Sequence, residues 1–268
     1  QLDESGRDIV PTHHDITLDR ISFSYGERPL LRDISAEIPE RSLTAIVGPS
    51  GSGKTTLCHL IARFWDVDAG TITIGGHNVK EYTLASLMAQ ISIVFQRVYL
   101  FHDTIENNIR FGRPQASRAE VIAAAKKAAC HDFITRLPNG YETMVGEGGA
   151  NLSGGEKQRI SIARAILKDA PIIIFDEATA NVDPENEDRL QQAIEALTQD
   201  KTVIMIAHRL NTVRNAAQIL VVADGRIVQR GTHEELIAKD GIYADFIASR
   251  RTAVGWRLSS STAQSKIG

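Results

Sequence analysis

The sequence predicts an α/β fold in which helices cover both faces of a mainly parallel sheet. Three observations predict it: short apolar runs, helical segments that alternate with those runs, and a middle third with mostly helical patterns. Strands that alternate with helices form parallel sheets, because each helix carries the chain back across the sheet. With 268 residues, of which 43% are hydrophobic and 24% charged, the chain can bury a core of this kind.

The predicted strands are short and come in two groups. Alternating apolar residues predict a strand from Asp15 to Ser24, and the continuous apolar run LTAIVG (Leu43–Gly48) predicts one that is buried on both faces. The segment TITI (71–74) completes the first group. The later strands are predicted at 171–177, 202–208 and 218–225.

The predicted helices lie between these strands. Apolar residues at helical spacing follow Lys54, and this helix is expected to stop near Gly70. Roughly Leu84 to Glu156 is predicted to be mostly helical, with capping-box spacing between Ser117 and Glu120. Two further helices are predicted at 155–169 and 184–198, and Asp183 with the following proline suits the start of the second.

Composition and patterning divide the chain into three parts. Residues 1–14 are polar and aperiodic and are predicted to be a linker, residues 15–248 form the folded domain, and residues 249–268 form a tail predicted to be disordered. The first residue is Gln1 rather than methionine, which fits an excised fragment and fits processing equally well. A net charge of −3 argues against a nucleic-acid partner. Cys58 and Cys130 match no metal spacing and no disulfide framework.

The segment GPSGSGKT (Gly48–Thr55) fits the pattern G-x-x-x-x-G-K-[ST] between a predicted strand and a predicted helix. In this context backbone N–H groups surround phosphate oxygens, Lys54 reaches the β and γ phosphates of a nucleotide, and the Thr55 hydroxyl binds Mg²⁺. The alternative is a glycine-rich turn with an incidental lysine, and the strand–loop–helix context favours the phosphate site. The predicted nucleotide-binding residues of this loop are Gly48, Pro49, Ser50, Gly51, Ser52, Gly53, Lys54, Thr55 and Thr56.

A second strand supplies the acidic residues that such a loop requires. Four apolar residues in PIIIFDE place Asp176 at the carboxyl edge of the sheet, where ligands of open α/β sheets bind. Asp176 is predicted to help hold Mg²⁺, and Glu177 to polarise the water that attacks the γ phosphate. A solvated acidic pair at a strand end is the alternative, and pairing with the phosphate loop favours the site.

The segment NLSGGEKQR (Asn151–Arg159) is a second candidate phosphate cradle without a lysine at the phosphates. Ser153 and Glu156 have capping-box spacing, so a well-formed helix start is the simplest interpretation. Gly154 and Gly155 leave the backbone bare, which a cap does not need but an approaching phosphate does. Residue chemistry alone leaves both interpretations open.

LSGGEKQR resembles the signature sequence of the ATP-binding cassette (ABC) family, and the resemblance extends from about Ile16 to Ile247 with the motifs in the family's order. It implies a P-loop NTPase core of the RecA-like type, with a mainly parallel sheet, an antiparallel β subdomain near the N-terminus and an α-helical signature subdomain at about 84–156. It also implies an ATPase that uses Mg²⁺.

The resemblance assigns roles to four more residues. Tyr25 in FSYG matches the aromatic residue that stacks on adenine, and Gln96 matches the glutamine that touches Mg²⁺ and the attacking water. Asp183 matches the D-loop aspartate, and His208 matches the switch histidine near the γ phosphate. Taken alone, Tyr25 suits a half-buried strand aromatic, Asp183 suits a helix cap, and His208 suits a structural histidine.

In this family two cassettes pair head to tail, and the signature of one covers the ATP in the P-loop of the other. The resemblance therefore implies a second cassette, identical or different. Its ATP site would be completed by Ser153, Gly154, Gly155 and Glu156 of this chain.

TMVGEGG (Thr143–Gly149) and GRIVQRGTHEEL (225–236) are similar to exporter-fold transporters, in which the cassette follows membrane helices in one polypeptide. This implies a position on the cytoplasmic face of a membrane, with the bacterial inner membrane as the expected one. The ending RRTAVGWRL resembles siderophore-linked members, and a basic solvated tail is the alternative.

Four positions depart from the family pattern. Arg41 stands where glycine is common, Arg97 stands where an acidic residue is common, and Asn181-Val182 replaces the usual D-loop pair. None of these changes removes a catalytic group. The expected function is ATP hydrolysis that powers transport across a membrane, and the alternatives are a soluble ABC ATPase and a non-hydrolysing regulatory cassette.

Overall fold

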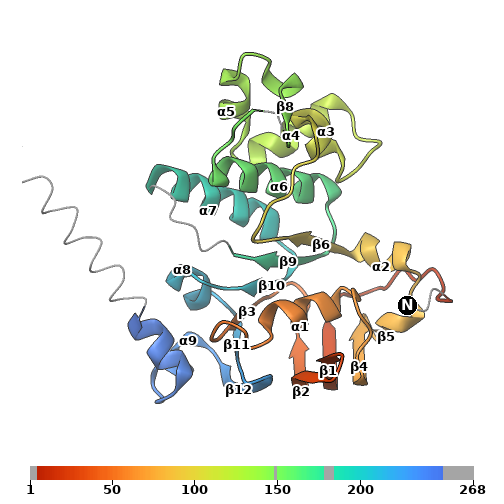
Figure 1. Ribbon diagram of the computed structural model, residues 1–268, viewed down its shortest axis with the longest axis vertical. Coiled ribbons are helices and arrows are strands. Elements are labelled where there is room, and N and C mark those ends of the chain that lie inside the picture. Colours follow the sequence, from red (N-terminus) through yellow and green to blue (C-terminus); the bar gives the residue numbers. More distant parts are fainter. Residues whose placement is uncertain (1–4, 148–149, 178–183, 250–268) are drawn as a thin grey trace, which may run out of the picture.

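The computed structural model describes residues 5–147, 150–177 and 184–249, and its centre is a six-stranded sheet (Figure 1). The strand order is β12-β11-β3-β10-β9-β6. Five neighbouring strands run parallel, and β12 pairs antiparallel with β11 at one edge. The strands are β3 (Leu43–Val47), β6 (Ile91–Val94), β9 (Ile172–Asp176), β10 (Thr202–Ile206), β11 (Gln218–Ala223) and β12 (Arg226–Gly231). The predicted mainly parallel sheet is confirmed.

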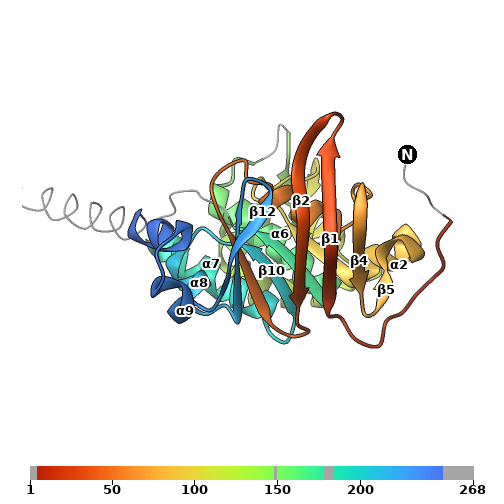
Figure 2. The same ribbon diagram turned by 90° about the horizontal axis from the view of Figure 1, so that it is seen from below.

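A four-stranded antiparallel sheet, order β2-β1-β4-β5, lies below the central sheet (Figure 2). Its strands are β1 (Ile16–Tyr25), β2 (Arg28–Ile38), β4 (Ala69–Ile74) and β5 (His77–Asn78). It is the antiparallel subdomain that the resemblance implies.

The apolar runs bury both faces of the central sheet. On β9, Ile173 and Phe175 belong to the core shared with the helices above the sheet, whereas Ile172 and Ile174 belong to the core shared with α1 and the antiparallel sheet below. This alternation follows from the two-residue period of a strand. Each fully buried isoleucine contributes roughly 1.5–3 kcal/mol through removal of apolar surface from water.

Helices lie on the two faces of the central sheet and beside it (Figure 1). Helix α1 (Lys54–Ile61) lies below, and α6 (Gly154–Lys168) and α7 (Pro184–Thr198) lie above. The segment between β6 and α6 forms the helical part above them. Its elements are β7 (Asp103–Thr104), α3 (Ile105–Arg110), α4 (Arg118–Lys127), α5 (His131–Arg136), η2 (Gly140–Glu142) and β8 (Met144–Val145). The remaining helices are η1 (Val79–Glu81), α2 (Leu84–Gln90), α8 (Leu210–Arg214), α9 (His233–Ile237) and a helical segment over 242–249.

The helix starts predicted at Ser117 and Ser153 are confirmed, and α9 begins in the same way at Thr232. Ser117, Ser153 and Thr232 each accept a hydrogen bond from the backbone N–H of the glutamate three residues later. In each case the glutamate side chain returns a bond to the cap residue's own N–H, which completes a capping box.

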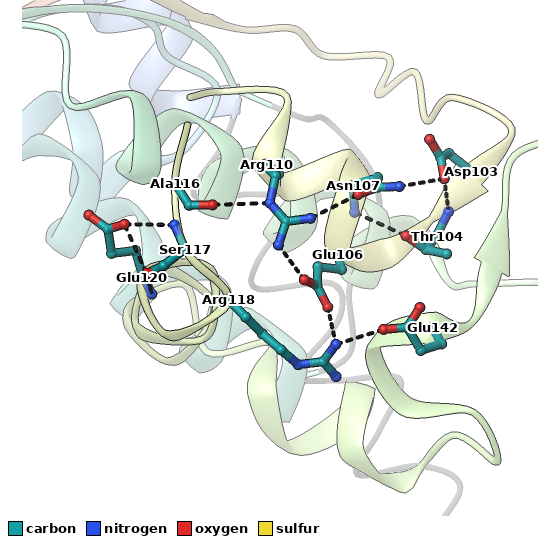
Figure 3. A network of polar contacts seen from close by, with 10 residues as sticks. All are labelled: Asp103, Thr104, Glu106, Asn107, Arg110, Ala116, Ser117, Arg118, Glu120 and Glu142. Atoms are coloured by element: carbon teal, nitrogen blue, oxygen red, sulfur yellow. Dashed lines mark hydrogen bonds and ion pairs between the residues drawn. The ribbon is translucent and has the colours of Figure 1, made fainter. Parts of the chain in front are cut away.

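A network of ion pairs and hydrogen bonds links the elements of the helical part (Figure 3). The buried carboxylate of Glu106 on α3 pairs with Arg110 and, at 2.5 Å, with Arg118 on α4. Arg118 also lies 2.7 Å from Glu142 of η2. The network therefore joins α3, α4 and η2, which all precede the LSGGE segment in the chain.

The structure corrects two predicted boundaries. The helix after Lys54 ends at Ile61 rather than near Gly70, because Arg63 adopts a left-handed φ of 54° that stops it. The region from Leu84, predicted to be mostly helical, contains β6, which pairs with β9 as an edge strand of the central sheet. The helical subdomain therefore begins after Val94.

The predicted linker is fixed to the domain along its described part. Arg7 forms a bridge with Tyr82, and Asp8 accepts a 2.6 Å hydrogen bond from Thr83, the cap residue of α2. Ile9 is buried in the lower core. The predictions for Asp183, Asn181-Val182, Gly148-Gly149 and residues 250–268 lie outside the described residues.

Candidate functional site

The loop between β3 and α1 turns on glycines that other residues cannot easily replace. Gly53 caps α1 in the left-handed region at φ 104°, and a Cβ there would meet a methyl of Leu31 at 2.5 Å. Gly51 has φ 76°, and a Cβ there would point into open space. The loop therefore combines a tight turn with bare backbone that faces outward at the start of a helix, which suits an anion.

Lys54, the first residue of α1, is folded back over this loop. Its Nζ donates hydrogen bonds to the carbonyls of Gly48 (2.9 Å) and Pro49 (2.7 Å) and lies 3.5 Å from the Ser52 hydroxyl. Burial lowers the pKa of Lys54, and the charge of Asp176 opposes that shift. The ammonium is thus held beside the bare backbone, where it can meet a bound phosphate.

Thr55 and Asp176 meet at the carboxyl edge of the sheet, 121 residues apart in sequence. The Thr55 hydroxyl lies 3.5 Å from Oδ2 of Asp176. A hydroxyl and a carboxylate beside a phosphate loop are hard oxygen ligands, which is the donor set that Mg²⁺ takes together with substrate phosphates. The residues present fit Mg²⁺, with Thr55 and Asp176 as the side chains that would hold it.

Replacing Asp176 with asparagine is expected to stabilise the nucleotide-free chain at pH 7 by up to about 1 kcal/mol, a value limited by solvent screening of a half-exposed group. Burial raises the pKa of Asp176, although the Thr55 hydrogen bond and the Lys54 charge oppose the shift. Because the folded-state pKa lies above the unfolded-state pKa, ionisation of Asp176 costs stability at high pH, and this cost disappears below the unfolded-state pKa. Urea unfolding should show the advantage of the variant at pH 7 and its decline as the pH falls. A variant less stable than wild type at pH 7 would contradict this electrostatic account.

Glu177 turns its carboxylate toward the segment between β10 and α8. Its Oε2 accepts hydrogen bonds from the backbone N–H groups of His208 (2.6 Å) and Arg209 (2.9 Å), and Oε1 accepts one from the Thr212 hydroxyl (2.9 Å). The Arg209 guanidinium lies 3.5 Å from Oε1, and Glu177 is only 1% exposed. The structure therefore brings Glu177 and His208 together, with the carboxylate engaged by this segment.

Tyr25 is the last residue of β1 and contacts the helix that follows the phosphate loop. Its hydroxyl lies 3.3 Å from Oγ1 of Thr56 on α1, and the residue is 44% exposed. An exposed aromatic ring tied to the helix that follows the phosphate loop can stack on a nucleobase.

Gln96 lies two residues beyond β6, and β6 is the neighbour of β9, which carries Asp176. Gln96 is exposed, beside a groove of about 410 Å³ between the central sheet and the helical part. The principal groove residues are Phe95, Arg97, Tyr99, Phe101, Phe111 and Arg164. Arg164 of α6 donates a 2.8 Å hydrogen bond to the carbonyl of Asn108 and lies over the rings of Phe101 and Phe111.

The LSGGE segment begins α6, on the opposite face of the central sheet from α1 (Figure 1). Ser153 caps the helix and is bonded to Glu156. A Cβ at Gly154 would meet nothing within 4 Å, and its φ is not left-handed. The fold of this chain therefore does not require glycine at position 154, whereas the close approach of an external group would.

Sequence reasoning missed the partners that hold Glu177. Arg209 adjoins the predicted His208, but nothing in the sequence indicates that Arg209 and Thr212 bind a carboxylate more than thirty residues earlier. Cys58 and Cys130 are free and buried. In the described part of the chain, no helix combines the length and apolar character needed to cross a bilayer, and no cluster of three metal-binding side chains occurs there.

Comparison with known proteins places these features in a family. The family model for ABC transporters matches residues 31–180. The chain is 52% identical over 228 residues to an ATP-dependent lipid A-core flippase of Syntrophus aciditrophicus (strain SB), covering 85% of this chain and 38% of the flippase. It is 50% identical over 230 residues to a putative multidrug export ATP-binding/permease protein of Staphylococcus aureus (strain NCTC 8325 / PS 47), covering 85% of this chain and 40% of that protein.

A solved structure agrees with the fold. A bacterial Atm1-family ABC exporter with ATP bound superposes with a TM-score of 0.87 at 45% identity, covering 93% of this chain and 44% of the exporter. The chain thus spans about two-fifths of the length of these relatives. The family model covers more than half of the chain, and the phosphate loop, the acidic strand end and the LSGGE helix all lie in one fold. The chain therefore belongs to the ABC transporter family.

Proposed function

We propose that this chain binds ATP with Mg²⁺ and hydrolyses it, and that it is the ATP-hydrolysing part of a transporter. The observation that carries the proposal is the meeting of Lys54, Thr55 and Asp176 at the carboxyl edge of the central sheet. In phosphoryl transfer, positioning and charge neutralisation supply most of the catalysis, and these three side chains are suited to both. Bound Mg²⁺ would neutralise phosphate charge, held by Thr55 and Asp176 with Gln96 as a further oxygen donor.

Glu177 is the proposed base for the attacking water, and His208 the proposed contact to the γ phosphate. The Glu177 carboxylate accepts bonds from His208 N–H, Arg209 N–H and the Thr212 hydroxyl. Because Glu177 is only 1% exposed, water can reach its carboxylate only if the surrounding segment moves. Movement of the segment that contains His208 would therefore release the base and bring the histidine to the phosphate in one step.

A second cassette would complete the site. Ser153, Gly154, Gly155 and Glu156 are proposed to cover the ATP of the partner, together with Asp183. The bare backbone at Gly154 supports this role, as does the location of α6 on the face of the sheet opposite to α1. The partner is either a second copy of this chain or a different cassette.

The groove beside Gln96 is the proposed contact with a membrane domain, fused upstream in the full protein. Exposed Phe95, Tyr99 and Phe111 supply apolar surface there. The names of the relatives refer to a lipid A-core flippase, to multidrug export and to an ABC exporter. They support ATP-powered transport across a membrane. The proposed location of this chain is the cytoplasmic face, with the bacterial inner membrane as the proposed membrane.

The dependence of turnover on chain concentration tests this function. If two chains form each pair of sites, phosphate release per chain should rise with chain concentration until dimers saturate, and should require Mg²⁺. A rate per chain that is constant across the whole range would argue against a site shared by two chains. ATP binding without any turnover would instead support the regulatory alternative.

Replacing Gly154 with alanine is expected to leave the fold intact or stabilise it by roughly 0.5–1 kcal/mol, because alanine is a better helix former and its methyl group meets no atom. The same methyl group would obstruct a phosphate that approaches this backbone. Phosphate release per chain should therefore fall at least tenfold, a loss of about 1.4 kcal/mol, while thermal stability is unchanged or higher. Full activity in the alanine variant would contradict close approach by a ligand.

A further inference from the structure

Phe23, Tyr25 and Trp65 form an aromatic cluster at the candidate nucleobase-binding site. The ring centroids of Tyr25 and Trp65 are 5.4 Å apart at an interplanar angle of 90°, and those of Phe23 and Tyr25 are 4.9 Å apart at 85°. Trp65 is 41% exposed, although it is large and apolar. Two rings thus meet Tyr25 edge to face, an arrangement that aromatic pairs prefer.

The loop that carries Trp65 is fixed by a buried arginine. Arg63 takes a left-handed φ of 54°, which ends α1 and redirects the chain. Its guanidinium donates to Oδ1 of Asp66 (3.0 Å) and to the carbonyl of Tyr82 (3.3 Å). Arg63 is only 2% exposed, so these bonds replace water that it has lost.

The far end of the same loop is bonded to the strand that carries Tyr25. The N–H of Asp68 donates to the carbonyl of Ser22 (2.9 Å), and its carboxylate accepts from the N–H of Ser24 (2.7 Å). Trp65 therefore has a fixed position relative to β1, because the loop that carries it is bonded at both ends. The contact between the rings of Trp65 and Tyr25 is fixed with it.

We infer that Trp65 is a positioning residue for nucleobase binding: it holds the ring of Tyr25 at the angle at which a purine can stack on it. The inference rests on the proposed ATP site and on the proposed role of Tyr25. Among the described residues, the one hydrogen-bond partner of the Tyr25 hydroxyl is Oγ1 of Thr56, at 3.3 Å, so the ring depends on its aromatic neighbours for orientation. Without Trp65, ATP binding would have to order that ring, which weakens affinity.

Calorimetry of the full chain tests this role with two ligands, MgATP and inorganic tripolyphosphate, which has no base. Trp65→Ala is expected to weaken MgATP binding about three- to tenfold, in line with the strength of aromatic pairs. Affinity for tripolyphosphate should be unchanged, because the phosphate loop is intact. Trp65→Phe keeps a ring and should bind MgATP within twofold of wild type. Val228→Ala, at an exposed position on β12, is the control.

Three results would overturn the inference. They are equal MgATP affinity in Trp65→Ala and wild type, an equal loss of affinity for MgATP and tripolyphosphate, and no rescue by phenylalanine. Tyr25→Ala distinguishes a failure of the Trp65 role from a failure of the proposed nucleobase site. If Tyr25→Ala weakens MgATP binding while Trp65→Ala does not, only the role of Trp65 is wrong. If Tyr25→Ala has no effect on MgATP binding, the proposed nucleobase site itself is wrong. In a Trp256→Phe background Trp65 is the one remaining tryptophan, and its emission should respond to MgATP but not to tripolyphosphate.

Discussion

Replacing Glu177 with glutamine is expected to lower the rate of ATP hydrolysis by a factor on the order of 10³, with ATP affinity changed by less than about threefold. General base catalysis contributes typically 10²–10⁴-fold, and an amide cannot accept the proton of the attacking water. Affinity should persist because the carboxylate faces the His208 segment rather than the phosphate loop.

The fold should tolerate this change. The amide oxygen can accept the two N–H bonds now made to Oε2, and the amide nitrogen can donate to the Thr212 hydroxyl. Single-turnover phosphate release, with affinity measured separately, separates chemistry from binding. Glu195→Gln, on the exposed face of α7, is the matched control. A glutamine variant that hydrolyses ATP at the wild-type rate would exclude Glu177 as the base.

Replacing Lys54 with alanine is expected to weaken ATP binding by at least about 100-fold, which corresponds to roughly 2.7 kcal/mol. The ammonium is held within the phosphate loop by the carbonyls of Gly48 and Pro49. Hydrogen bonds to charged groups are worth about 1.5–3 kcal/mol each, and a nucleotide offers several phosphate oxygens. Arginine is not expected to restore binding, because its planar fork is larger than the compact ammonium.

Calorimetry with MgATP measures this loss, and Lys239→Ala, at an exposed position after α9, is the control of equal charge change. Unfolding of the Lys54 variant should resemble that of wild type, since the hydrogen bonds of this side chain within the described residues are to its own loop. Wild-type affinity in the Lys54 variant would mean that this loop is not the phosphate cradle.

Local sequence patterns predicted the central strands, the helix caps and the phosphate loop, because each of these depends on residues that are close in sequence. The five-residue strands β3, β9 and β10, which carry short apolar runs, are buried on both faces as their composition indicates. The capping boxes at Ser117 and Ser153 depend only on residues three apart. The phosphate loop is likewise a contiguous motif, so its residues could be named before the fold was seen.

The features that sequence could not predict depend on contacts between distant segments. Helix α1 ends early where Arg63 takes a left-handed φ of 54°, with its buried guanidinium bonded to the carbonyl of the distant Tyr82. Strand β6 has only four residues, and its identity depends on pairing with β9 about eighty residues later. The engagement of Glu177 by Arg209 and Thr212 and the contact of Trp65 with Tyr25 are likewise tertiary, and no motif marks them.

The most direct test of the central claim is the mass in solution of the Glu177→Gln chain with and without MgATP, by light scattering after size exclusion. Of the two proposed partners, this measurement tests the second copy: the LSGGE segment of one chain would complete the ATP site of another copy of the same chain. This pairing predicts a monomer without nucleotide, a dimer with MgATP, and loss of that dimer when Ser153 is replaced by tryptophan. A chain that is saturated with MgATP and remains monomeric would contradict it.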